Sequence, residues 1–210
     1  KSFYFSEKSA DDKEAFNHPA PFLIKDIEKL ISFFTKKGML VLDPFMGSGT
    51  TAIAAFNLNR KSLGIDLSEE YYELAKTRFI KKQMIENEHY EYIVGDSLIV
   101  LEKINKKVDY IVTSPPYHNI LKNDGAGIRS DNSDKGYRNG SRQGIEFYSD
   151  CSSDLGNQNT YEEFLHLFYK IMEKAYNVLD DKKYCSIIIS DFTVDKKEVC
   201  VQGDIVKTME

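Results

Sequence analysis

The feature that most constrains the fold is a regular alternation of short apolar runs with segments of helical period. Apolar residues recur with helical spacing over residues 23–34, and small residues form a helical run over 50–56. Short segments with the length and character of strands lie at 39–42, 61–66, 90–94, 108–112 and 184–189. Strands that alternate with helices predict an α/β fold with a doubly wound, mostly parallel sheet, in which a ligand binds beyond the carboxyl ends of the strands.

Capping patterns place two further helices between these runs. Ser68 can cap one helix, and Thr160 with Glu163 forms a capping-box pattern ahead of a helical stripe that reaches Leu179. The run at 184–189 is continuous in apolar character, which is typical of a parallel strand that is buried on both faces. We therefore expect a buried fifth strand.

Length and composition narrow the class of protein. The 210 residues are those of a single domain, which we place over 1–210. No apolar run approaches the roughly 20 residues of a membrane span and no secretory signal opens the chain, so we expect no membrane partner. The net charge of −5 argues against a generally basic nucleic-acid coat protein but allows a local basic surface. The three cysteines are widely spaced without a CxxC pair, so we expect a reducing, cytoplasmic location and no metal site.

Polar residues that could bind a ligand or take part in catalysis stand at the ends of the expected strands. They are Asp43, Asp66, Asp96 and Ser114, and parallel strands would bring them to one edge of the sheet. Asp66 can accept both hydroxyls of a ribose, and Asp96 can accept from an adenine amino group. Each has an ordinary alternative, a helix-end charge for Asp66 and a turn-forming side chain for Asp96.

A glycine-containing turn, Asp-Pro-Phe-Met-Gly-Ser-Gly-Thr at 43–50, joins the first strand to the following helix. Glycines let a backbone approach a ligand closely, and a helix N-terminus offers free N–H groups. Two glycines alone would more often make only a tight turn. The stretch lacks the Gly-Lys-Ser/Thr of a phosphate-binding loop and the three spaced glycines of a dinucleotide-binding turn, which excludes both classes.

A second turn, Ser114-Pro115-Pro116-Tyr117, follows the fourth strand. The two prolines lack backbone donors and stiffen the chain, so the carbonyls ahead of them become rigid acceptors. A hydroxyl and an aromatic ring flank them. This set suits a planar base that carries an amino group, although a stiff turn that merely ends a strand is the alternative.

At these residues the sequence resembles the amino-methyltransferases of DNA, which modify adenine N6 or cytosine N4. The segment 43–51 resembles the cofactor-binding motif of that family, and 114–117 resembles its catalytic motif. The segment 18–22, His-Pro-Ala-Pro-Phe, resembles the part that closes over the methionine moiety of the cofactor, although His18 can also be an ordinary polar residue ahead of a helix. The resemblance runs from His18 to about Asp191 and implies S-adenosylmethionine as cofactor and DNA as partner.

The resemblance also implies a fold and a set of site residues. The fold is Rossmann-like with seven strands, of which this sequence accounts for five, so we expect a sheet that is incomplete at the C-terminus. The residues that we expect to bind the cofactor are His18, Pro19, Asp43, Pro44, Phe45, Gly47, Ser48, Gly49, Thr50, Asp66, Leu67, Asp96 and Ser97, and the expected catalytic residues are Ser114, Pro115, Pro116 and Tyr117.

The implied reaction is direct methyl transfer to the amino nitrogen of a base that has left the DNA helix. Ser114 and the carbonyl of Pro115 would accept hydrogen bonds from the amino group, while Tyr117 would stack on the base. Ser at position 114 resembles the cytosine-N4 enzymes, so cytosine N4 is favoured over adenine N6. A cognate restriction endonuclease is a further expected partner.

Two other functions remain open. One is methylation of an exocyclic amine in RNA, where related turns usually carry Asn or Asp in place of Ser114. The other is a nucleic-acid-binding module that does not bind the cofactor. The presence of all the strand-end acids argues against this module. Cytosine carbon-5 methylation needs a Cys after a Pro as nucleophile, and no cysteine follows a proline here.

Residues 118–158 differ in character, because they are rich in Gly, Ser, Asn and Asp and show little periodicity. Positive charge gathers in the first part of this segment, and acidic residues follow it. We expect a mobile insertion that closes over the flipped base, with Arg129, Arg138 and Arg142 binding DNA. A solvated, disordered insertion is the alternative.

Neutralising Arg129, Arg138 and Arg142 together tests this expectation. DNA affinity falls and its salt dependence flattens, by about 0.9 in the log–log slope for each phosphate group that the variant no longer binds. Affinity for S-adenosylmethionine, measured by calorimetry, is retained. If the triple variant keeps the DNA affinity and salt slope of the wild type, the segment does not bind DNA.

Overall fold

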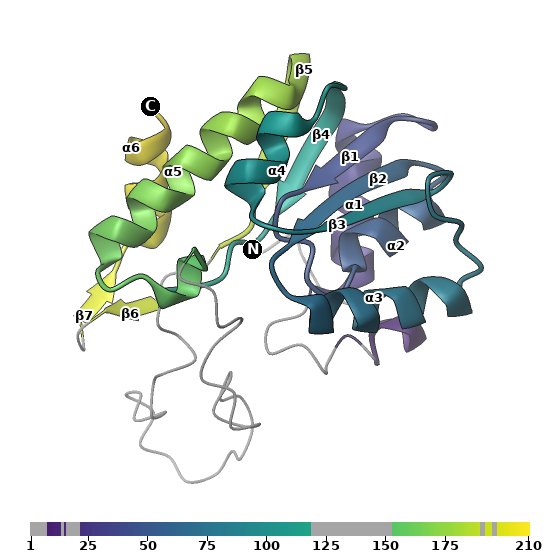
Figure 1. The fold of residues 1–210 in the computed structure, drawn as a ribbon, viewed down its shortest axis with the longest axis horizontal. Coiled ribbons are helices and arrows are strands. Elements are labelled where there is room, and N and C mark those ends of the chain that lie inside the picture. The colour runs from purple at the N-terminus through teal and green to yellow at the C-terminus, as the bar shows by residue number, and fades with distance from the viewer. Residues whose placement is uncertain (1–7, 14, 16–21, 119–152, 190–191, 195–196) are drawn as a thin grey trace, which may run out of the picture.

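The computed structural model describes residues 8–13, 15, 22–118, 153–189, 192–194 and 197–210 (Figure 1). Its centre is a five-stranded sheet in the order β3-β2-β1-β4-β5. The strands are β1 (Leu40–Asp43), β2 (Lys61–Asp66), β3 (Tyr90–Val94), β4 (Val108–Thr113) and β5 (Leu179–Ile187). All neighbouring pairs are parallel, which confirms the expected α/β, doubly wound sheet. The strand order reverses between β1 and β4, the position at which such sheets bind ligands.

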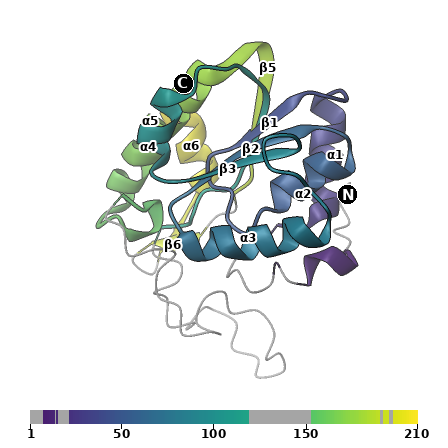
Figure 2. The same cartoon turned by 45° about the vertical axis from the view of Figure 1, so that its right-hand side comes forward.

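Helices cover both faces of the sheet (Figures 1 and 2). One face carries α1 (Ile24–Phe34), α2 (Thr50–Asn57) and α3 (Glu69–Lys81), and the other carries α4 (Ser97–Lys103) and α5 (Tyr161–Val178), with α6 (Val201–Met209) packed against α5. Successive strand residues point to opposite faces. Val41 therefore belongs to the core under α1 and α2, and its neighbour Leu42 to the core under α4 and α5.

The short strands β6 (Phe192–Val194) and β7 (Lys197–Val199) form an antiparallel pair ahead of α6. Among the residues that the structure describes, no helix is both long enough and apolar enough to span a membrane.

The helix caps expected from the sequence are present. Ser68 Oγ accepts a hydrogen bond from the Tyr71 N–H at 3.2 Å at the start of α3. Thr160 Oγ1 accepts from the Glu163 N–H at 3.1 Å at the start of α5. These short-range bonds explain why both helix starts could be predicted, since each satisfies a backbone donor that would otherwise lack a partner.

One helix, α4, was not expected from the sequence. Its apolar residues form a continuous run, which does not distinguish a short helix from a strand. The structure shows that Asp96 caps it, because Asp96 Oδ1 accepts from the Leu98 N–H at 2.9 Å.

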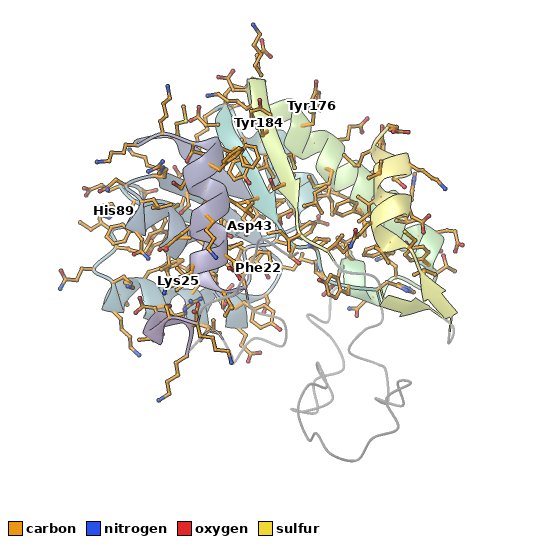
Figure 3. The ribbon with its side chains drawn as sticks, turned by 180° about the vertical axis from the view of Figure 1, so that it is seen from behind. Phe22, Lys25, Asp43, His89, Tyr176 and Tyr184 are labelled. Carbon is orange, nitrogen blue, oxygen red and sulfur yellow. The ribbon has the colours of Figure 1, made fainter. Side chains whose placement is uncertain are left out.

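The last strand of the sheet differs from the expectation. β5 begins at Leu179, directly after α5, and it pairs with β4 alone, so it is an edge strand of the described sheet. Tyr184 on this strand is 59% exposed, although its ring lies beside the end of α1 and contacts Phe34 (Figure 3). The expectation of a buried strand was wrong. Apolar composition shows that a strand can pack in a core, but it does not show whether a second strand lies beside it.

Two glycines with the same unusual backbone conformation allow a controlled test of packing. Gly38 has a φ of +82° and Gly49 a φ of +79°. A Cβ at position 38 would meet no atom within 4 Å, whereas a Cβ at position 49 would lie 2.5 Å from Cζ of Phe79 and 3.0 Å from Cβ of Ala75. Gly49 is therefore required by a close approach of α3 as well as by its φ.

We expect Gly38→Ala to lower the free energy of unfolding by roughly 1–2 kcal/mol, the cost of a left-handed non-glycine residue. Gly49→Ala carries the same strain and adds overpacking of about 1–3 kcal/mol. Urea unfolding of both variants checks this difference. Equal losses would show that α3 moves away from the turn without cost.

Candidate active site

A cavity opens at the carboxyl ends of the parallel strands, beside the point where the strand order reverses. Its walls come from the glycine turn, the ends of β2, β3 and β4, and the start of the segment that leads into α5. The residues that line it are Pro44, Phe45, Gly47, Asp66, Leu67, Tyr71, Asp96, Ser97, Ser114, Pro115, Pro116, Tyr117, Ser153, Asp154, Leu155 and Ile171. The cavity therefore brings the two motifs of the sequence together.

Some of the expected site residues lie elsewhere. Asp43, Ser48, Gly49 and Thr50 are buried behind the cavity and do not line it. His18 and Pro19 lie outside the described residues, as do Arg129, Arg138 and Arg142.

The glycine turn is held by hydrogen bonds from β2, β3 and α4. The Gly47 N–H donates to Asp66 Oδ2 at 2.7 Å, and the Gly47 carbonyl accepts from the Tyr92 hydroxyl at 2.8 Å. The Pro44 carbonyl accepts from Ser97 Oγ at 2.6 Å. Gly47 has a φ of +51°, a conformation that favours glycine. Because its polar groups are bound on both sides, the turn presents a fixed backbone to the cavity.

Arg78 holds the same turn from its outer side, and the sequence offered no signal for this role. This side chain of α3 is 2% exposed and donates to the Ser48 carbonyl. It also donates to Ser48 Oγ and Thr50 Oγ1, both at 3.1 Å, and to the Asp11 carbonyl at 3.4 Å. Arginine in the middle of a helix is usually a surface residue. Here its hydrogen bonds direct the side chains of Ser48 and Thr50 toward α3, so these two residues support the turn and do not line the cavity.

Asp43 connects the glycine turn to the end of β4. Its Oδ2 accepts from Thr51 Oγ1 at 2.5 Å, and its Oδ1 accepts from Thr113 Oγ1 at 2.6 Å and from the Phe45 N–H at 3.1 Å. The residue is 1% exposed and lies near the centre of the molecule (Figure 3). Burial raises its pKa to about 6, although the hydrogen bonds oppose this rise. Its carboxylate therefore positions both motifs.

Asp66 ends β2 and lines the cavity directly. Its Oδ1 accepts from the Ser68 N–H at 3.0 Å, while its Oδ2 accepts from the Gly47 N–H. Burial raises the pKa of Asp66 to about 6; these two hydrogen bonds lower it, and the nearby charges of Asp43 and Asp154 raise it further. Each oxygen of an ionised carboxylate accepts two hydrogen bonds, so both keep capacity for a hydroxyl donor.

The Ser114-Pro115-Pro116-Tyr117 turn leaves the end of β4 and contributes all four residues to the cavity wall. His118 follows it and is buried. The His118 Nε2 lies 3.0 Å from the Gln158 carbonyl, which can only accept, so this nitrogen donates. This bond links the Ser-Pro-Pro-Tyr turn to the segment ahead of α5.

Several lining residues were not singled out from the sequence. Tyr71 reaches the cavity from the first turn of α3, and Ile171 reaches it from α5. Ser153, Asp154 and Leu155 come from a segment far along the chain, and no local pattern marked them.

The raised pKa of Asp43 has a consequence for stability. The pKa of Asp43 is about 6 in the folded protein, compared with 3.8 for an ordinary Asp side chain. The folded state therefore binds the proton more tightly than the unfolded state, and this contribution to stability is fully present below pH 4 and is lost as the pH rises through 6. We expect Asp43→Asn to gain about 3 kcal/mol of unfolding free energy relative to the wild type between pH 4 and pH 7. Urea unfolding at several pH values measures the difference. The exposed Asp181→Asn serves as control, and parallel pH profiles for wild type and Asp43→Asn would contradict the prediction.

Sequence comparisons identify relatives of the N-terminal part of the chain. Residues 2–77 match the model of the N6_N4_Mtase family, described as DNA methylase. Orphan methyltransferase M.BamHII of Bacillus amyloliquefaciens is 49% identical over 72 residues, which cover 34% of this chain and 27% of that protein. Type II methyltransferase M2.LlaDCHI of Lactococcus lactis subsp. cremoris is 43% identical over 70 residues, which cover 33% of this chain and 26% of that protein. The matched part thus spans about a quarter of the length of these curated relatives.

A solved structure extends the likeness beyond that part. TrmN from Thermus thermophilus superposes with a TM-score of 0.55 and 20% sequence identity, over 85% of this chain and 41% of that chain. At this identity the likeness establishes the fold alone, a Rossmann-like α/β fold. The family match covers the glycine turn and Asp66 and ends within α3, ahead of the Ser-Pro-Pro-Tyr turn. Residues 2–77 of this chain are therefore similar to the DNA methylase family model and to these methyltransferases.

Proposed function

We propose that the protein transfers a methyl group from S-adenosylmethionine to the exocyclic amine of a base in DNA, with cytosine N4 favoured. One observation carries the proposal: the glycine turn, the strand-end acids and the Ser-Pro-Pro-Tyr turn line a single cavity. A methyl donor and an amine held there would lie side by side. The family match of residues 2–77 supports DNA as the substrate.

The residues of the cavity fit S-adenosylmethionine, the cofactor of this family. Asp66 keeps acceptor capacity on both oxygens, which suits the two ribose hydroxyls. Asp96 uses Oδ1 for the Leu98 N–H, so its second oxygen can accept from the adenine amino group. Leu67 and Phe45 supply apolar surface for the adenine ring. When bound, the cofactor supplies an electrophilic methyl group on a sulfonium.

The Ser-Pro-Pro-Tyr turn suits the amine that receives this methyl group. The amino nitrogen of a base is a poor nucleophile, because its lone pair is delocalised into the ring. Ser114 Oγ and the Pro115 carbonyl can accept its two hydrogens, which favours a more tetrahedral, electron-rich nitrogen and stabilises the positive charge that develops on it. Tyr117 can stack on the base and offset about 1–3 kcal/mol of the cost of flipping it. No side chain is required as a covalent nucleophile.

The proposed role of Asp66 predicts a loss of cofactor affinity. Asp66→Ala removes two charge-assisted hydrogen bonds and weakens S-adenosylmethionine binding by on the order of 2–4 kcal/mol. The wild-type affinity also falls as the pH drops below about 6, because protonation removes acceptors that the ribose needs. Calorimetry across pH 5–8 measures both effects, with Asp180→Ala, an exposed acid of β5, as control. An unchanged affinity would show that Asp66 only holds Gly47 and Ser68.

The identity of the product tests the function itself. The full-length protein is incubated with S-adenosylmethionine and either DNA or RNA, and the digested nucleosides are analysed by mass spectrometry. We expect N4-methylcytosine from DNA. N6-methyladenine from DNA would overturn the preference for cytosine, and methylated nucleosides from RNA alone would overturn DNA as the substrate.

A further inference from the structure

One part of the cavity wall comes from Ser153, Asp154 and Leu155, just ahead of α5. Asp154 is 2% exposed and starts a 3-10 turn over Leu155–Asn157. Its Oδ1 accepts from the Gly156 N–H at 2.8 Å, and its carbonyl accepts from Gln158 Nε2 at 2.9 Å. The carboxylate is therefore held in a fixed position at the cavity wall.

This wall is also attached to the catalytic turn. The Gln158 carbonyl accepts from His118, the residue that follows Tyr117. The His118 ring packs near Tyr161 and Phe164 of α5, with centroid distances of 6.2 Å and 6.0 Å. Asp154 and the Ser-Pro-Pro-Tyr turn thus form one rigid side of the cavity.

The charges of the cavity share one sign. Asp66, Asp96 and Asp154 line it, and none of the described lining residues is Lys, Arg or His. The charge of Asp154 acts on other residues of the cavity, since it contributes to the raised pKa of Asp66 and of Tyr71. Charges interact strongly in such a buried setting, because the effective dielectric constant is far below that of water.

The reaction changes the charge of the cofactor at one atom. S-adenosylmethionine carries a positive sulfonium, and after methyl transfer the same sulfur is a neutral thioether in S-adenosylhomocysteine. The remaining groups of the two molecules are identical. A carboxylate at the cavity wall therefore attracts the donor more than the product, whereas a purely steric or hydrogen-bonding residue would treat both alike.

We propose that Asp154 is a specificity-determining residue whose buried carboxylate favours the sulfonium donor over its thioether product, and thereby promotes exchange of product for fresh cofactor. This inference rests on the proposed function. Of the three acids that line the cavity, Asp154 is the one tied through Gln158 and His118 to the Ser-Pro-Pro-Tyr turn, so its charge lies on the side of the cavity where the methyl group would be transferred.

The test is the ratio of two dissociation constants, measured by calorimetry at pH 8 on the full-length protein. Asp154→Asn is nearly isosteric and keeps an oxygen for the Gly156 N–H. We expect the dissociation constant of S-adenosylmethionine to rise about tenfold, or about 1.4 kcal/mol, and that of S-adenosylhomocysteine to change less than about twofold. Asp154→Ser, whose hydroxyl can also accept from Gly156, gives the same shift in ratio if the Asn variant does not fold.

The matched control is Asp204→Asn. Asp204 is a partly buried acid of α6 whose Oδ2 accepts from the Tyr161 hydroxyl at 3.1 Å, and it does not line the cavity. Its substitution removes one negative charge near α5, and we expect it to leave the ratio unchanged.

The outcomes distinguish a failure of this inference from a failure of the proposed methyltransferase function. If the wild type binds neither ligand, the proposed function fails. If the wild type binds both and Asp154→Asn weakens both equally, Asp154 is a structural residue and the inference is overturned. A variant with an unchanged ratio but a lower rate of methylation would place Asp154 against the target base, which also overturns it.

Discussion

The carboxylate of Asp43 is the interaction on which the arrangement of the site depends. β1 and β4 pair only through Val41 with Tyr110 and Leu42 with Ile111, so the backbone ladder that joins these two strands is short. Asp43 extends this connection, since it accepts from Thr113 at the end of β4 and from two groups beyond β1. Because the two turns start from these strand ends, their relative position follows from one buried carboxylate. Burial disfavours its charge, and the donors around it compensate in part.

Around this centre, the glycine turn is fixed from both sides before any ligand arrives. Arg78 binds its outer side through Ser48 and Thr50, and Asp66 binds its inner side through Gly47. A backbone that is already ordered loses little conformational freedom on binding, so more of the interaction energy appears as affinity. The same bonds leave Asp66 in a double role, as support for the turn and as proposed acceptor for the cofactor.

The first four strands could be located from the sequence to within a residue or two, since each is a short segment centred on apolar residues that is followed by, or ends in, a turn or polar residue. The caps of α3 and α5 were equally accessible, because donor and acceptor lie three residues apart. Prediction failed where the outcome depends on neighbours. β5 has the composition of an interior strand but lies at the edge of the described sheet, and the run that forms α4 has no helical spacing to identify it.

The sequence by itself determined the fold class, the turns at the strand ends and the family resemblance of the glycine turn, because these follow from local spacing and residue type. Only the tertiary structure decided which of these side chains face the cavity. It turned Ser48 and Thr50 toward Arg78, buried Asp43 between two strands, and brought Asp154 to the same cavity as Asp66. The physical reason is that these contacts join residues 28 to 70 positions apart, or come from separate elements that meet only when the sheet and its helices pack.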